Sequence, residues 1–181
     1  MEKEKINYLD PKYREIIATL KEQRLKRVLF VCLGNICRSP AGEGVLRALV
    51  AENGKEAEWE IDSAGTGGYH AGDLPDRRMR VHALQRGLTL DHICRKVRPS
   101  DFEDFDLIIG MDDNNVRDLR RIAPSIEAAR KIVPMAAFID PGMRYDYVPD
   151  PYYEGAEGFE LVLDLLQNGC ANMFALLSHD N

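Results

Sequence analysis

The segment Cys32–Pro40, CLGNICRSP, is the feature that most constrains what this chain can fold into. It follows a run of strand-forming residues, Val28–Val31, and its end predicts the start of a helix. In α/β proteins, ligands bind beyond the carboxyl ends of the strands, where a helix N-terminus directs free N–H groups toward an anion. The segment therefore predicts an α/β fold with an anion site at its first strand-to-helix turn.

Cys32 and Arg38 are the predicted reactive residues of this turn. They bracket five residues, so the loop can curl until its amides converge on one tetrahedral oxyanion. The guanidinium of Arg38 would hold two phosphoryl oxygens. Cys32 would lie beneath the phosphorus as a thiolate, because a helix N-terminus and a nearby cation lower the pKa of a thiol from about 8.5 to roughly 3.5–7.5. The predicted phosphate-binding loop comprises Leu33, Gly34, Asn35, Ile36, Cys37 and Arg38.

Four neighbouring residues distinguish this loop from a cysteine that only fills the core. Gly34 permits a positive φ where the backbone wraps a ligand, and Asn35 tolerates the left-handed region. Ser39 suits the N-cap of the helix, and Pro40 suits its first position. The Ser39 hydroxyl can also donate a hydrogen bond to the Cys32 sulfur and stabilise the thiolate.

Strands and helices alternate along the rest of the chain. Apolar runs predict strands, apolar residues at helical spacing predict helices, and Pro134 predicts an edge strand. The predicted strands lie at about 27–31, 59–63, 106–111 and 132–135, and the helices at about 11–23, 75–85, 113–122 and 159–177, with one more from 40. This order predicts a three-layer doubly wound fold with a mainly parallel four-stranded sheet, preceded by an N-terminal helical extension.

The composition fits one domain with a proper core and excludes several classes of protein. The chain has 181 residues, 45% of them hydrophobic, and no apolar run approaches the ~20 residues of a membrane span. Its net charge of −6 argues against nucleic acid as a partner. The four cysteines match no disulfide framework or zinc site, so we expect no metal. Together with the lack of an apolar secretory segment, they predict a cytoplasmic protein.

Displacing an oxygen from phosphorus also needs a proton donor, and Asp150 is the candidate. One carboxyl group can protonate the leaving oxygen and later activate water. Pro149 and Pro151 flank Asp150 and stiffen its loop, although acidic proline-rich loops are also common on surfaces without a function. Tyr152 and Tyr153 follow, and their broad rigid rings can either wall a slot for an aromatic ring or pack in the turn.

The combination of segment 32–40 with Asp150–Tyr153 (DPYY) resembles the low-molecular-weight protein tyrosine phosphatases. Further matches are Asp62–Gly65, His92 and Phe105–Asp112. The resemblance covers the chain from about Lys26 onward. It implies a phosphatase domain at residues 26–181 and leaves residues 1–25 as a helical extension.

The resemblance implies a reaction on phosphotyrosine-containing proteins. Cys32 attacks phosphorus, Arg38 clamps the phosphoryl group, and Asp150 acts first as general acid and then as general base. A phosphocysteine intermediate releases inorganic phosphate, and no metal or cofactor is required. The implied substrate slot comprises Leu33, Ile36, Tyr69, Tyr152 and Tyr153. The implied supports of the loop are Asn35, Ser39, Ser63 and His92.

Three other functions fit parts of this pattern. A thiol-coupled arsenate reductase uses a similar loop but needs two further cysteines, whereas Cys94 stands alone and Cys170 lies on the core stripe of the last helix. Related bacterial phosphoarginine phosphatases carry a small hydroxyl residue in the loop, where Ile36 is apolar and bulkier. A silent phosphate-binding module is disfavoured because every catalytic part is present.

Two further residues carry expectations of their own. Gly42 departs from the family, which usually has alanine there, and is expected to weaken the first helical turn slightly. Cys37 lies five residues from Cys32 on the same loop. We predict that it is a redox partner, because a sulfenic acid formed at Cys32 condenses readily with a nearby thiol.

Overall fold

Four parallel strands form the centre of the fold in the computed structural model, which describes residues 8–178. The strand order is β2-β1-β3-β4, which confirms the predicted four-stranded parallel sheet and places the strand with Pro134 at an edge. The strands are β1 (Lys26–Cys32), β2 (Trp59–Gly65), β3 (Leu107–Gly110) and β4 (Ile132–Pro134).

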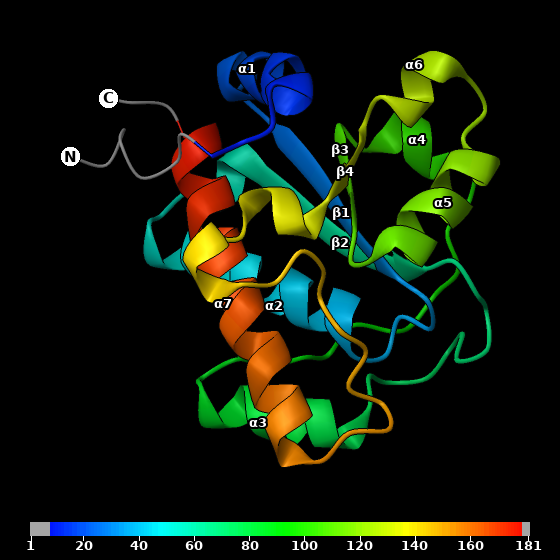
Figure 1. The fold of residues 1–181 in the computed structure, drawn as a ribbon, viewed down its shortest axis with the longest axis vertical. Coiled ribbons are helices and arrows are strands. Elements are labelled where there is room, and N and C mark those ends of the chain that lie inside the picture. The colour runs from blue at the N-terminus through cyan, green and yellow to red at the C-terminus, as the bar shows by residue number, and fades with distance from the viewer. Residues whose placement is uncertain (1–7, 179–181) are drawn as a thin grey trace.

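Helices cover both faces of the sheet, which gives the predicted three layers (Figure 1). One face carries α1 (Arg14–Glu22), α2 (Arg38–Glu52), α3 (Arg77–Gln85) and α7 (Ala156–Leu177). The other carries α4 (Asp101–Asp104), α5 (Asp113–Ile122) and α6 (Ile126–Ala129). Short 3-10 turns lie at Pro11–Tyr13, Glu56–Glu58, Met135–Phe138 and Pro141–Met143.

The central strand β1 supplies both hydrophobic cores because its side chains alternate between the two faces. Val28 and Phe30 lie in the core beneath α2 and α7, whereas Leu29 and Val31 lie in the core beneath α5. The helix after β1 covers one face and the helix after β3 covers the other. The carboxyl ends of these two neighbouring strands therefore form a topological switch point, where α/β folds bind ligands.

The start of α2 differs from the prediction. The helix begins at Arg38 with Cys37 at its N-cap, so the prediction that Ser39 is the N-cap and Pro40 the first helical residue is wrong. The Ser39 hydroxyl instead contacts Cys32 and Asn35. Pro40 remains within the first turn, where the backbone N–H groups lack helical partners in any case.

The N-terminal helix α1 packs onto the same core as α2 and α7. Ile17 and Leu20 are buried there, and Tyr8 donates a hydrogen bond from its hydroxyl to the carbonyl of Phe138 (2.9 Å). Residues 1–7 of the predicted extension lie outside the described residues. Within residues 8–178, no helix is long and apolar enough to cross a membrane.

Candidate active site

The loop between β1 and α2 is held from outside through its carbonyl groups. The carbonyl of Leu33 accepts a hydrogen bond from the Gly67 amide (2.8 Å), and that of Ile36 accepts one from the Asp76 amide (2.8 Å). Asn35 has a φ of +58°, in the left-handed region as expected. These contacts fix the peptide planes of the loop before any ligand binds.

Gly34 serves the loop in a different way from the one predicted. Among the described residues, the glycines with a positive φ are Gly54, Gly72 and Gly87. Gly34 is not one of them, so the expectation of a left-handed glycine in the loop is wrong. A Cβ at this position would instead lie 3.2 Å from Cδ2 of His70. The glycine therefore allows the His70 side chain to lie close against the loop backbone.

A buried hydrogen-bond network supports the loop from below and reaches the Cys32 sulfur. The side-chain amide of Asn35 donates to Oγ of Ser39 (2.8 Å) and to Oγ of Ser63 (3.0 Å). Ser39 Oγ lies 3.0 Å from Cys32 Sγ and 3.3 Å from the carbonyl oxygen of Ala64. Because Ser39 accepts from Asn35, its single proton can go either to the sulfur or to the Ala64 carbonyl, and the contact with the sulfur is the shorter of the two.

His92 anchors the far end of this network. Its Nε2 lies 2.9 Å from Oδ1 of Asn35, and its Nδ1 lies 3.2 Å from Oε1 of Glu43 and 3.3 Å from Oδ1 of Asp62. Burial raises the pKa of Glu43, while His92 and a hydrogen bond from Ser63 act to lower it. The predicted supports Asn35, Ser39, Ser63 and His92 are thus joined in one network.

The same three groups, Glu43, Asp62 and His92, are the cluster among the described residues whose ligand atoms lie close enough to hold a metal, within 4.8 Å of one another. Their polar atoms are already engaged. Arg47 donates to Glu43 (3.1 Å), and Arg95 donates to Asp62 (3.0 Å). The two guanidinium groups neutralise the negative charge of the carboxylates, which would otherwise attract a metal cation.

Arg38 is almost fully buried and is oriented by acidic partners. Its Nη1 donates to Oδ2 of Asp112 (2.6 Å) and to the carbonyl of Val148 (3.1 Å), and its Nη2 lies 3.6 Å from Oδ2 of Asp150. Burial opposes the charged form, but the charges of Cys32, Asp112 and Asp150 together raise the pKa of Arg38. The guanidinium is therefore a fixed cation beside the loop.

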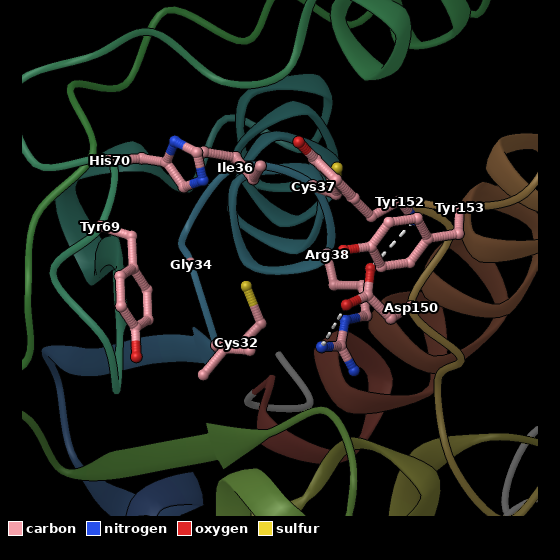
Figure 2. Close-up of a pocket in the computed structure, with 11 residues that line it drawn as sticks. Cys32, Gly34, Ile36, Cys37, Arg38, Tyr69, His70, Asp150, Tyr152 and Tyr153 are labelled. Carbon is pink, nitrogen blue, oxygen red and sulfur yellow. Dashed lines mark hydrogen bonds and ion pairs between the residues drawn. The ribbon is translucent and has the colours of Figure 1, made fainter.

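A cavity of about 250 Å³ opens above the loop. Cys32 points into it, with Tyr69 on one side and Asp150 and Tyr152 on the other (Figure 2). The side chains of the rim are accessible, with exposed fractions of 80% for Tyr69 and 93% for Tyr153. The cavity is lined by Cys32, Leu33, Gly34, Ile36, Cys37, Arg38, Tyr69, His70, Asp150, Tyr152 and Tyr153. It therefore includes every predicted catalytic and slot residue.

Two further thiols lie at the loop. Cys37 is buried on the cavity wall, and burial raises the pKa of its thiol, followed by the charge of Asp76. Cys94 is also buried and donates from Sγ to the carbonyl of Asn35 (2.8 Å). Burial and the charge of Cys32 raise the pKa of Cys94 to about 11.

Comparisons with known proteins identify the family of this chain. The sequence profile for low molecular weight phosphotyrosine protein phosphatases matches residues 27–181. The chain belongs to this family. A low molecular weight phosphotyrosine protein phosphatase of Gallus gallus is 40% identical over 146 residues, which cover 81% of this chain and 92% of that one.

Solved structures of the phosphatase family share the fold. A protein tyrosine phosphatase from Entamoeba histolytica, crystallised with Hepes in the active site, aligns with a TM-score of 0.80 at 41% identity and covers 83% of this chain and 95% of that one. An arginine phosphatase of Drosophila aligns with a TM-score of 0.77 at 30% identity, covering 85% and 99% of the two chains. The predicted family and fold are confirmed.

Sequence reasoning missed several residues of this phosphatase-family site. The sequence singles out Asp112 only as the end of a segment that resembles the family, yet its carboxylate both caps α5 and accepts the hydrogen bond that orients Arg38. Glu43 and His70 were not singled out, although Glu43 contacts His92 and His70 lines the cavity. Glu43 lies four residues after Ser39, in the first turns of the helix that follows the loop, and this helical spacing is the available signal.

Proposed function

We propose that this chain hydrolyses phosphotyrosine in proteins through a phosphocysteine intermediate. The observation that carries the proposal is one cavity that holds Cys32, Arg38 and Asp150 together, with aromatic side chains at its mouth. A nucleophile, a fixed cation and a carboxyl group are the parts that phosphoryl transfer to a protein side chain requires.

The first step transfers the phosphoryl group to the enzyme. The Cys32 thiolate attacks phosphorus and forms the S–P bond, while the P–O bond to tyrosine breaks. Asp150 gives its proton to the departing phenolic oxygen, which leaves as neutral tyrosine. Arg38 and the loop amides stabilise the charge on the phosphoryl oxygens during transfer.

The second step regenerates the enzyme. Asp150, now ionised, takes a proton from water as the water oxygen attacks phosphorus. The S–P bond breaks, the electron pair returns to Cys32, and inorganic phosphate leaves. The Ser39 hydroxyl, 3.0 Å from the sulfur, stabilises the returning thiolate by donating a hydrogen bond to it.

The slot determines which phosphate esters can react. Tyr69 lies on one side of the cavity, and Tyr152 and Tyr153 lie on the other (Figure 2). Leu33 and Ile36 also line it. An aromatic substrate ring gains contact area between such rigid side chains at low entropic cost. Ile36 offers no hydroxyl for a guanidinium substrate, which favours phosphotyrosine over phosphoarginine.

Substitution of Cys32 and Asp150 tests the mechanism. Cys32→Ser is expected to abolish turnover while the folded protein still binds inorganic phosphate, because a serine oxygen is a far weaker nucleophile at neutral pH. Asp150→Asn is expected to lower kcat/KM for phenolic esters with poor leaving groups by about 10²–10⁴-fold, and less for activated esters. Substantial activity of Cys32→Ser would contradict the mechanism.

Substrate comparison tests the specificity. Turnover of matched phosphotyrosine, phosphoserine and phosphoarginine peptides should favour phosphotyrosine, whereas faster turnover of the phosphoarginine peptide would support the alternative function. Thiol-dependent reduction of arsenate would support a reductase. We also propose a reducing compartment such as the cytoplasm, because a reducing environment keeps the nucleophilic thiol free.

A further inference from the structure

One face of α3 packs against the start of α7, just after the segment that carries Asp150. Three residues at intervals of four form this face: Arg78 and His82 in α3, and Arg86 at its C-cap. The His82 ring stacks on Phe159, with ring centroids 5.6 Å apart and an interplanar angle of 5°. Arg86 forms ion pairs with Glu160 and with Asp164 (2.8 Å). The face therefore fixes the beginning of α7.

Arg78 stands at the end of this face that is nearest to the catalytic segment. Its guanidinium carbon lies 4.9 Å from the ring centroid of Phe159 and 5.3 Å from that of Tyr152. Both distances are within the range of a cation–π interaction. Asp76 holds the guanidinium through two hydrogen bonds, from Nε to Oδ1 (3.1 Å) and from Nη2 to Oδ2 (2.9 Å). Asp76 thus fixes the orientation of the guanidinium relative to the two rings.

Both ends of this arrangement contact the candidate active site. The Asp76 amide donates to the carbonyl of Ile36 in the phosphate-binding loop (2.8 Å). The Tyr152 amide donates to Oδ1 of Asp150 (3.0 Å). A continuous series of contacts therefore leads from the loop through Asp76 and Arg78 to Tyr152 and the carboxyl group of Asp150.

We propose that Arg78 is a positioning residue for the general acid. It holds Tyr152 in place and thereby keeps the Asp150 carboxyl group at a fixed position above the phosphate-binding loop. Asp150 itself is accessible to solvent, and a loop with so exposed a side chain needs an external support to keep its geometry. The inference rests on the proposed function, because it assigns Arg78 a task only if Asp150 protonates the leaving oxygen.

Two esters of similar shape separate this task from a role in the substrate slot. Phenyl phosphate has a poor leaving group, whereas the leaving group of p-nitrophenyl phosphate needs little protonation. Damage to the slot wall lowers kcat/KM equally for both. In Arg78→Ala we expect kcat/KM for phenyl phosphate to fall roughly three- to thirtyfold, as the loss of a cation–π contact implies, and that for p-nitrophenyl phosphate to fall less.

Matched variants test whether the effect belongs to Arg78. Arg77→Ala removes the adjacent arginine of the same exposed turn, and Arg86→Ala weakens the packing of α3 on α7 without touching Tyr152. Both should keep the wild-type ratio of the two kcat/KM values. Arg78→Lys should recover only part of the effect, because lysine lacks the planar fork that Asp76 grips. A changed ratio in Arg86→Ala equal to that in Arg78→Ala would overturn the proposal in favour of general packing.

A double-mutant cycle gives the decisive result. If Arg78 acts through Asp150, Arg78→Ala has little further effect on the ester ratio in an Asp150→Asn background. Additive losses, or an unchanged ratio in the folded single variant, would overturn the inference. Thermal unfolding shows that each variant is folded. Residual activity of Cys32→Ser would instead count against the proposed function, so the two failures are distinguishable.

Discussion

Arg38 and Asp112 form a short charge-assisted hydrogen bond, 2.6 Å from Nη1 to Oδ2. The other carboxylate oxygen of Asp112 accepts from the backbone N–H of Asn115 (2.8 Å) and caps α5. One side chain thus orients the guanidinium that we propose binds phosphate, and it also caps the helix that follows β3. Donors that are fixed before the reaction stabilise the transition state without reorganisation.

Two substitutions of Asp112 separate these roles. Asparagine is also a good N-cap, whereas alanine is not. We expect Asp112→Asn and Asp112→Ala both to lower kcat/KM about tenfold, since hydrogen bonds to charged groups are worth about 1.5–3 kcal/mol. Only Asp112→Ala should lower the free energy of unfolding by about 1 kcal/mol for the lost cap. Wild-type kinetics in Asp112→Asn would show that Arg38 needs no clamp.

Gly42 allows α2 to pack closely on β1, and its replacement by alanine should destabilise the protein. A Cβ there would lie 2.8 Å from Cδ1 of Phe30 and 3.2 Å from Cε of Met111. The gain in helix propensity, about 1 kcal/mol, is opposed by an overpacking cost of about 1–3 kcal/mol. We expect a net loss of about 1 kcal/mol in denaturant unfolding of Gly42→Ala.

A double variant checks the reason for this loss. Combining Gly42→Ala with Phe30→Leu should cost less than the sum of the two single changes, because the shorter side chain relieves the contact. If Gly42→Ala instead raised the free energy of unfolding by about 1 kcal/mol, the full gain in helix propensity, the result would contradict a close contact between α2 and the Phe30 side chain. The sequence alone predicts only that Gly42 weakens the helical turn slightly, because it does not show that Phe30 lies against this position.

The N-terminal helix should contribute to stability without contributing to the chemical step. Leu20 is 1% exposed in the core shared with α7, so Leu20→Ala should lower the free energy of unfolding by about 2–5 kcal/mol. Glu15→Ala, on the exposed side of the same helix, is the matched control. None of the described residues 8–25 lines the cavity, so kcat/KM of the folded variants should remain unchanged. A large kinetic loss in folded Leu20→Ala would contradict this separation.

The parts of the site that were predictable are those encoded locally. The loop from Cys32 to Arg38 is contiguous, so its spacing alone indicates which side chains converge. The alternation of strands and helices likewise predicts the fold, because each element buries its own apolar face. The chemistry makes Asp150 a candidate proton donor, but its local sequence is like that of many surface loops, so the proposed role depends mainly on the family resemblance.

The remaining features depend on tertiary neighbours. Asp112 reads as a helix cap from its local sequence, and its second contact exists only because β3 lies beside β1 in the sheet. Ser39 is an equally good cap by residue type, but its hydroxyl is engaged by Asn35 and faces Cys32. Propensity describes the isolated segment, whereas the partners of these polar atoms come from distant parts of the chain.

The contact of α3 with α7 should make stability depend on pH. Hydrogen bonds from His82 and Arg86 lower the pKa of Glu160 below its ordinary value of 4.5. A depressed pKa in the folded state means that the contribution is present above pH 4.5 and is lost as the pH falls through the folded value. Glu160 and its two partners are partly exposed, so we expect them to contribute less than about 1 kcal/mol to the free energy of unfolding.

This pH dependence is measured as the difference in unfolding free energy between wild type and Glu160→Gln across acidic pH. The difference should be largest near neutrality and should shrink as the solution is acidified. Glu157→Gln, an exposed carboxylate on the same helix, is the control. A difference that grows with acidification would reverse the assigned sign.

Cys37 should protect Cys32 from permanent oxidation, and the protection should increase with pH. Peroxide converts the Cys32 thiolate to a sulfenic acid. The Cys37 thiolate then attacks that sulfur and forms a disulfide, while the S–O bond breaks and the oxygen leaves as hydroxide, which takes a proton from solvent to become water. Burial raises the pKa of the Cys37 thiol, so only a small fraction is thiolate at neutral pH. That fraction rises about tenfold per pH unit below the pKa, and closure accelerates with it.

Mass spectrometry after peroxide treatment at mildly acidic and mildly alkaline pH measures this protection. The wild type should form more Cys32–Cys37 disulfide and less sulfinic Cys32 at the alkaline pH, and a thiol should restore its activity. Cys37→Ala, shown to be active beforehand, should lose activity irreversibly at both values. Cys94→Ala tests the third thiol at the loop, because its loss should leave the disulfide yield unchanged if Cys37 is the partner. A sulfinic Cys32 beside a free Cys37 at both pH values would rule out the protective role.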